Sequence, residues 1–457
     1  MHAARWLATL RMPGTPGVLG TLGVLGTLGV LGTFGVLGTF GVATARAETL
    51  QQAWQMAAEH DAALAASASQ QDAADAQLRA ARAAHWPSLA VGGSVDQLQD
   101  APALSIATAS GRLLSPAIFP DNRVGIASAE VSVPLYTSGH IDAAVQAARA
   151  GAAVAADLHA RSAEDLRLQV AQAYVDVLRT REALSVAQSQ LASLQAHLAD
   201  AQRLYAAQSV PLTDVLAARV ARANADQARL RAQNALQLAI AAYNRYLGQD
   251  LERVPQLDEQ LPAGAAALIG ANLQTLMERA LRARPELAAT AQSADAYQQQ
   301  ARAEAAQSGP QLALNLGYYH FDSTVLDRQD FGYVGVGLRW TLFDGGQTRA
   351  RADALRATAR AQQQQLQDLT SRIRLQVQQA WLDRTQAGAR LTSAADAVTQ
   401  AEENLRVARQ LYQAGAGTGS QVLDAESLRA AALTNRDDAH FDLAIAQFEL
   451  ERAVGVL

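Results

Sequence analysis

The chain has no cysteine and no lysine among its 457 residues, and aromatic residues make up only 5%. Without cysteine there is no disulfide, no thiolate metal site, no cysteine nucleophile and no lipid anchor on an N-terminal cysteine. All 38 basic residues are arginine, they form no basic run, and the formal charge is −5, so nucleic-acid binding has no electrostatic support. The eight histidines are scattered without metal-ligand spacing. We therefore expect no metal site, no cofactor and no nucleic-acid partner.

Catalytic motifs are missing as well. Glycine-rich stretches occur near the N-terminus and in strand-like segments, but no phosphate loop, nucleophile elbow or metal motif accompanies them. The sequence therefore predicts a protein without catalytic residues, and an enzyme is the least favoured functional class.

Residues 1–47 have the features of a secretory signal peptide. Arg5 and Arg11 precede an uncharged apolar run, and a small-x-small cleavage site ends at Ala47. The run consists largely of four copies of a hexamer, Gly-Val-Leu-Gly-Thr-Leu/Phe, and its length also permits a transmembrane anchor. Its glycine and threonine content favours cleavage, so we expect a mature chain that begins near Glu48 outside the cytoplasm.

Alanine-rich helical patterns fill most of the rest, and they are interrupted at two matching places. Short polar or Gly/Pro-containing breaks occur at 205–218 and at 412–425, where Tyr205 and Tyr412 are equivalent at an offset of 207 residues. A helical pattern that stops briefly and resumes is typical of two antiparallel helices joined by a tight turn. We call these breaks the first tip and the second tip.

The surroundings of the two tips repeat too. The decapeptide RLQVAQAYVD at 167–176 recurs as RLQVQQAWLD at 374–383. Internal repetition of this kind predicts a duplicated structural unit. We predict a first repeat at 48–248, a linker at 249–271 and a second repeat at 272–457, each with the order helix, strand pair, long helix, tip, helix.

Strand-like alternation marks the strand pairs, predicted at 87–136 and 310–343. In the second pair the alternation places apolar residues on one face and small or polar residues on the other. The apolar face comprises Leu312, Leu314, Leu316, Tyr318, Val334, Val336, Leu338, Trp340 and Leu342. A half-buried hairpin in a soluble sheet is one interpretation. No amphipathic helix is placed to cover the apolar face, and this favours contact with lipid.

The helices show a coiled-coil spacing. Before each tip, apolar residues recur at intervals of three and four, which lets antiparallel helices approach closely. One helical pattern runs from Thr49 to about Ala84, and another from Gly139 to about Ala207. At 1.5 Å per residue the latter would be roughly 100 Å long, far more than a bilayer of about 30 Å. The long helices must therefore project into an aqueous compartment.

Four strands per chain cannot close a barrel in a membrane, because open edges would leave backbone groups unpaired in hydrocarbon. A dimer would supply eight strands and an interior filled by side chains. A symmetric trimer would supply twelve strands, a lumen and a matching ring of helices. We expect a mostly α chain with a small β part: duplicated long antiparallel helical hairpins plus four strands that contribute to a trimeric 12-stranded barrel.

The order of elements resembles that of the TolC family of outer-membrane efflux and secretion ducts. The motifs that carry the resemblance are the two tips, the start ETLQQAW and the strand-to-helix junctions VPLYTSG and WTLFDGG, and it covers essentially the whole mature chain. It implies a passive homotrimeric channel with a β-barrel in the outer-membrane lipid and an α-barrel in the periplasm. The implied partners are a periplasmic adaptor (membrane fusion) protein and an inner-membrane transporter of the ABC, RND or MFS type. Drug efflux and type I protein secretion both remain open.

The resemblance also assigns candidate gate residues. Asp424 matches one of two acidic positions of the family's entrance, whereas Gln421 occupies the other. Tyr412 matches a tyrosine that helps to hold the tip closed, while Gly417 stands where the family carries a basic residue. The closing network implied here is thinner than the family pattern.

On the opposing first tip the family positions are taken by Thr213 and Asp214. We expect closure to depend on Tyr412, Asp214 and packing rather than on an arginine ion pair. Three copies of Asp424 would form a negative ring that favours cations.

Glycine content distinguishes the two tips. The second tip contains Gly415, Gly417 and Gly419, whereas the first contains Pro211. We expect the second tip to be the more flexible and the part that moves. A secreted structural or adhesive coiled-coil protein without a pore is the alternative from another functional class.

Overall fold

The computed structural model describes residues 47–100, 106–107, 109, 111, 113–114, 123–261, 270–322 and 327–457. The predicted signal peptide lies outside the described residues except for Ala47, and so does 262–269 of the predicted linker. Ala47–Leu457 forms one compact unit.

Long helices dominate this unit, and the breaks between them follow the predicted pattern closely. The two longest, α3 and α7, have 67 residues each, so each is roughly 100 Å long. The described helices are α1 (Leu50–His60), α2 (Ala62–Ala83), α3 (His140–Ala206), α4 (Leu212–Tyr246), α5 (Leu273–Ala283), α6 (Pro285–Ala306), α7 (Gln347–Gln413) and α8 (Gly419–Val454). Among them, none has an apolar stretch long enough to cross a membrane.

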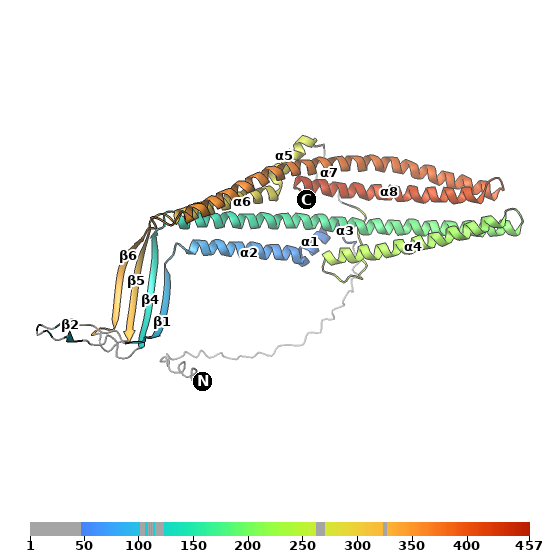
Figure 1. Cartoon of the computed structure of the whole chain (residues 1–457). Helices are drawn as coiled ribbons and strands as arrows, with labels where there is room; N and C mark the ends of the chain where they lie inside the picture. Colours follow the sequence, from blue (N-terminus) through green and yellow to red (C-terminus); the bar gives the residue numbers. More distant parts are fainter. Residues whose placement is uncertain are drawn as a thin grey trace, which may run out of the picture. The chain divides into compact units, whose positions relative to one another are not determined.

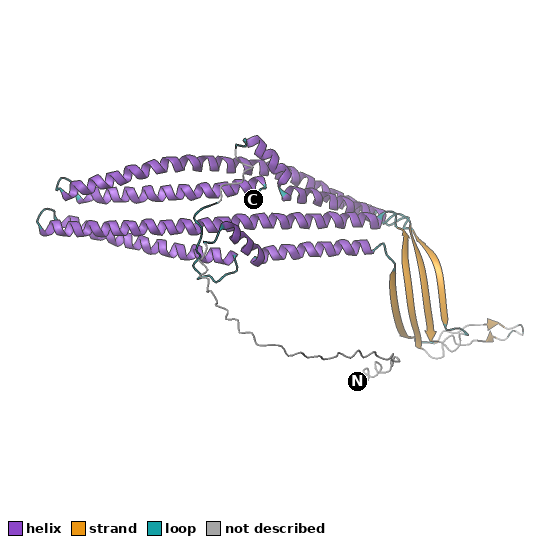
Figure 2. Cartoon of the chain, turned by 180° about the vertical axis from the view of Figure 1, so that it is seen from behind, coloured by secondary structure: helices purple, strands orange, loops and turns teal. Residues whose placement is uncertain are grey.

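The helices form two equivalent groups around α3 and α7. Along α3 lie α2 and then α4, and along α7 lie α6 and then α8 (Figures 1 and 2). The groups are joined because α3 also packs against α6 and α8. Each tip therefore belongs to a hairpin: α3 with α4 at the first tip, and α7 with α8 at the second.

The helical pattern predicted from Thr49 to Ala84 is broken, and its continuity was wrong. Asp61 separates α1 from α2 with an extended backbone (φ −71°, ψ 117°). Its carboxylate accepts a hydrogen bond from the Leu64 amide at 2.7 Å, so Asp61 is the N-cap of α2. The second repeat has the same break at Arg284, where Pro285 opens α6.

The four long strands form one antiparallel sheet in the order β1-β4-β5-β6. Pairing of β4 with β5 joins the two predicted repeats, and β1 and β6 are the edges. The bounds are β1 (Ser88–Gln97), β4 (Arg123–Tyr136), β5 (Gln311–Asp322) and β6 (Asp330–Arg339); β2 (Ile106–Ala107) pairs with β3 (Leu113–Leu114) separately. The last strand ends at Arg339, before the predicted Leu342.

Cross-strand register shows which residues share a face. Leu89 pairs with Val131, Val131 with Leu316, and Leu316 with Val334, so one apolar row crosses all four strands. Directly paired residues point to the same side of a sheet. Leu89 and Val334 are 69% and 71% exposed, so within a single chain this face lies open.

The opposite face is less uniformly small and polar than its sequence pattern predicted. Ser132 pairs with Asn315, and their side chains form a hydrogen bond of 3.0 Å. Toward the loop between β5 and β6, however, that face also carries an aromatic cluster of Tyr319, Phe321, Phe331 and Tyr333 with ring centroids 5.8–6.1 Å apart.

Candidate functional site

Each tip joins its helices through five residues, 207–211 in the first and 414–418 in the second. The backbone turns through a left-handed residue at equivalent positions, Gln208 with φ 58° and Gly415 with φ 72°. Glycine adopts this conformation without steric cost, whereas a glutamine does not. The two turns share one geometry, but only the second has the residue that suits it.

The start of the following helix also differs. Thr418 and Gln421 form a capping box: the Gln421 side chain accepts from the Thr418 amide at 3.0 Å, and the Gln421 amide donates to the Thr418 hydroxyl at 3.4 Å. Pro211, the N-cap of α4, makes no side-chain cap hydrogen bond. The side chain of Gln421, a predicted gate residue, therefore serves to start α8.

Close packing restricts two of the glycines in the second tip. A Cβ on Gly417 would lie 3.1 Å from both the Leu411 Cβ and the Tyr412 amide nitrogen, so any side chain here would require these neighbours to shift by a few tenths of an ångström. A Cβ on Gly419 would lie 2.9 Å from the Asp214 carboxylate of the first tip. Greater mobility of the second tip stays a prediction.

Tyr412 lies at the centre of the contact between the tips. It is 1% exposed and packs in an apolar cluster contributed by both hairpins, with Ala201, Val215, Leu405, Val422 and Ala425. Its hydroxyl lies 3.5 Å from the Asp214 carboxylate, at the long end of the range for a hydrogen bond. Burial, and next the Asp214 charge, raise the pKa of Tyr412 to about 12, so the phenol stays neutral and donates.

A buried histidine that was not singled out in the sequence adjoins this contact. The His197 ring of α3 lies 5.1 Å from the Tyr412 ring, and His197 is only 5% exposed. Within the described part of the chain its Nε2 has no hydrogen-bond partner. Burial lowers the pKa of His197 below its ordinary value, so the neutral ring is favoured.

The structure does not bring every predicted gate residue into this contact. Asp424 and Thr213 are exposed, and neither side chain makes a hydrogen bond or ion pair with any other described residue of the chain. Asp424 is on the first turns of α8 and Thr213 at the start of α4. Both are thus free to face water or another chain.

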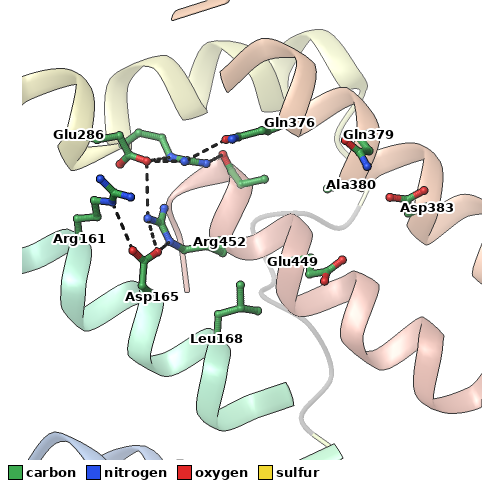
Figure 3. A pocket seen from close by; sticks show the side chains of 12 residues that line it. Arg161, Asp165, Leu168, Glu286, Gln376, Gln379, Ala380, Asp383, Glu449 and Arg452 are labelled. Atoms are coloured by element: carbon green, nitrogen blue, oxygen red, sulfur yellow. Dashed lines mark hydrogen bonds and ion pairs between the residues drawn. The ribbon is translucent and has the colours of Figure 1, made fainter. Parts of the chain in front are cut away.

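A second polar site lies where α6 begins and α8 ends (Figure 3), at the opposite end of α8 from the second tip. A cavity of about 350 Å³ is bordered there by a network of buried charges. Arg284 donates to Glu286 at 2.8 Å, and Arg452 lies 2.7 Å from Asp165 and 3.6 Å from Glu286. Burial would raise the pKa of Glu286, but hydrogen bonds and the two arginines hold it below its ordinary value. Arg284 also donates to the Ala453 carbonyl, so this network joins two helix ends.

No group of three or more His, Asp or Glu side chains among the described residues is arranged to hold a metal ion.

The sequence that forms the hairpins, tips and sheet matches a known protein family. A model described as "Outer membrane efflux protein" matches residues 53–249 and 276–456, which is most of the chain. The chain belongs to the outer membrane efflux protein family. The predicted resemblance to TolC-type channels is thereby confirmed.

Two relatives agree with this membership. The chain is 24% identical to outer membrane protein TolC of Vibrio cholerae over 421 residues, which cover 90% of this chain and 91% of that protein. It is 25% identical over 310 residues to the alkaline protease secretion protein AprF of Pseudomonas aeruginosa, covering 64% and 62%.

Solved structures show the same fold. The outer membrane protein VceC of Vibrio cholerae superposes with a TM-score of 0.75 at 19% identity, covering 89% of this chain and 96% of that one. The predicted fold class, long helical hairpins with four antiparallel strands per chain, is confirmed.

The protein is therefore an efflux channel protein of the cell outer membrane, with its helical part in the periplasm. Its family consists of channel and transport proteins. The alternative of a secreted adhesive coiled coil without a pore is set aside.

Proposed function

We propose that three copies of the chain form the exit duct of a tripartite efflux or type I secretion system. The observation that carries this proposal is the sheet: among the described strands, the outer edges of β1 and β6 have no partner strand, and an apolar row crosses the exposed face. Three such sheets joined edge to edge would pair every backbone group, as a lipid environment requires. Similarity to TolC and to a protease secretion protein supports the assignment to efflux or secretion.

The chain supplies a passage, and other proteins supply energy and cargo selection. We assign it a periplasmic adaptor protein and an inner-membrane transporter of the ABC, RND or MFS type as partners. The chain itself catalyses no reaction. The signal peptide 1–47 is removed. The mature chain then consists of two repeats, 48–248 and 272–457, joined by the linker 249–271.

The entrance lies at the tips. Tyr412 and Asp214 hold the second tip against the first within one chain, and Thr213 and Gln421 complete the set of gate positions. Asp424, exposed beside this contact, converges with its two copies into a negative ring. The second tip, which carries Gly415, Gly417 and Gly419, is the part that moves against the first.

Assembly and conduction test the duct. Native mass spectrometry of the purified protein is expected to give a trimer, and planar bilayers are expected to show discrete conductance steps. A monomer that inserts without conducting would contradict the proposal.

Ion selectivity tests the ring. Asp424→Asn is expected to reduce the preference for cations, measured as a shift of the reversal potential across a salt gradient. Asp72→Asn, the same charge change on an exposed residue of α2, is the matched control and should leave the potential unchanged. Equal reversal potentials for Asp424→Asn and the unmodified channel would exclude the ring.

A further inference from the structure

One carboxylate close to the second tip is buried, although its position in the sequence resembles that of a solvated helix residue. Glu426 of α8 is 1% exposed, and it follows Asp424 by two residues. A buried charge is stable only when other groups pair with it. The groups that pair with Glu426 therefore restrict the orientation of α8.

The partners come from three helices. Ser193 of α3 donates to Glu426 Oε2 at 2.6 Å, and Arg409 of α7 lies 3.3 Å from the same oxygen. Arg429 of α8 lies 3.4 Å from Oε1 and donates to Ser189 of α3 at 3.2 Å. Arg409 donates to Ser193 as well. We call this network the Glu426 bracket; it ties the second hairpin to the first.

The two serines of the Glu426 bracket lie on the same side of α3. Ser189 and Ser193 are one helical turn apart, so both point to the same side of α3, and His197 continues the row toward the tip. Arg429 reaches the first serine, and the carboxylate reaches the second. The row gives α8 fixed polar partners along α3.

Helix geometry relates the direction in which Asp424 faces to the position of Glu426. Two residues along an α-helix correspond to a rotation of about 200°, so Asp424 and Glu426 lie on nearly opposite sides of α8. Asp424 is exposed, while Val422 and Ala425 are buried on the inner side with Tyr412. Rotation of α8 that moved Asp424 would pull the Glu426 carboxylate from its partners.

Such a rotation is costly because hydrogen bonds to a charged group are roughly twice as strong as neutral ones. Removing the carboxylate has a different effect from removing its partners. The Arg409 and Arg429 side chains are 40% and 20% exposed, so they can turn to water when Glu426 is neutralised. Loss of the Glu426 charge therefore allows α8 to rotate and leaves neither arginine charge buried without a partner.

We propose that Glu426 is the positioning residue that fixes the rotation of α8 at the entrance and so keeps Asp424 turned away from the α3 side. The part played by Asp424 rests on the proposed function; the fixed rotation of α8 does not. Opening of the second tip then requires that the Glu426 bracket break or move as a unit.

Cysteine labelling tests this rotation directly, because the chain contains no cysteine of its own. In the full-length channel, the Asp424→Cys protein should react quickly with a hydrophilic maleimide, and the Ala425→Cys protein slowly. Adding Glu426→Gln is expected to raise the labelling rate of the Ala425→Cys protein about tenfold, which corresponds to about 1.4 kcal/mol. An unchanged rate would overturn the proposal.

Two controls separate rotation from general loosening. Glu403→Gln neutralises an exposed glutamate of α7 that pairs within its own helix with Arg406, and it should leave the rate unchanged. The Ala171→Cys protein reports on a fully buried site in α3 far from the tips, and it should stay protected beside Glu426→Gln. Equal acceleration at positions 171 and 425 would mean that the chain loosens everywhere and would contradict a positioning role.

A milder variant keeps the proposal testable if Glu426→Gln fails to assemble. Ser193→Ala removes the hydrogen bond to α3 and leaves the charges paired within the second hairpin. It is expected to accelerate labelling of the Ala425→Cys protein in the same direction by a smaller factor. Labelling needs no open pore, so a channel that labels as expected without conducting contradicts the duct alone.

Discussion

The two tips are copies of one turn built from different residues. The first has Gln208 in the left-handed position and Pro211 before α4, whereas the second has Gly415 and a Thr418–Gln421 capping box. By local chemistry alone the second tip is the better-formed turn. Duplication has therefore kept the backbone path while the means of stabilising it have diverged.

The second tip is also the more closely packed of the two. Tyr412 is buried between the hairpins, whereas its equivalent Tyr205 is 44% exposed. The second tip thus contributes the anchor, and the first contributes the surface that receives it, including Asp214. If the second tip moves, it moves as an intact turn whose contacts break, rather than by unwinding.

The largest expected effect comes from the anchor. Tyr412→Ala should destabilise the contact between the tips by about 3–5 kcal/mol, since a large buried ring leaves a cavity. Tyr205→Ala, the equivalent change on an exposed side chain, should stay within about 0.5 kcal/mol. Hydrogen exchange over 405–425 measures both. Equal protection in the two variants would contradict the assignment of Tyr412 as the anchor.

Tyr412→Phe serves as a further control for this prediction. It keeps the ring and removes only the long contact with Asp214, so we expect a loss of at most about 1 kcal/mol. A loss as large as that of the alanine variant would show that the hydroxyl, rather than the packing, holds the tips together.

Opposite effects are expected at the left-handed positions. Gly415→Ala should cost about 1 kcal/mol because alanine is strained at φ 72°. Gln208→Gly should stabilise the first turn by about 0.5–1 kcal/mol, after the greater unfolded-state entropy of glycine is subtracted. Thermal unfolding of the two variants checks the signs, and a loss of stability in both would refute strain at Gln208.

A smaller effect depends on pH. His197 has a lowered pKa in the folded chain, chiefly through burial, so its contribution to stability is complete above its ordinary pKa of about 6.5 and is lost as the pH falls below it. The groups that face it are Asp200 of its own helix, Asp214 of α4, and Arg409 and Tyr412 of α7.

Unfolding of the unmodified chain and of His197→Gln between about pH 5 and pH 7.5 measures this contribution. The difference between the two proteins should shrink as the pH falls. A difference that does not change with pH would contradict a buried neutral histidine.

Much of the fold could be predicted because the chain repeats itself. Glycine, proline and polar breaks located both tips, and strand alternation located the sheet within a few residues. The break at Asp61 was missed because an aspartate preceded by His60 carries a weak stop signal. Its equivalent in the second repeat, Arg284, precedes Pro285. Comparison of the two repeats at this position would have indicated the break at Asp61.

The site was harder to predict, since burial of a polar residue depends on which helix packs beside it. Tyr412 and Asp214 were found through the family resemblance, but His197 and Glu426 match the pattern of solvated helix positions. The row Ser189, Ser193, His197 was the available signal, because three polar residues at intervals of four mark one side of α3. Only the packing of α8 on α3 shows that this side is covered.

The central claim, that the tips form the entrance of the duct, is tested most directly by locking them. In this cysteine-free chain, Asp424→Cys places one thiol on each of the three proposed copies, and oxidation should form one disulfide that joins two of them across the entrance. We predict that the cross-link blocks transport and that a reducing agent restores it. Unimpaired transport with the disulfide formed would contradict the claim.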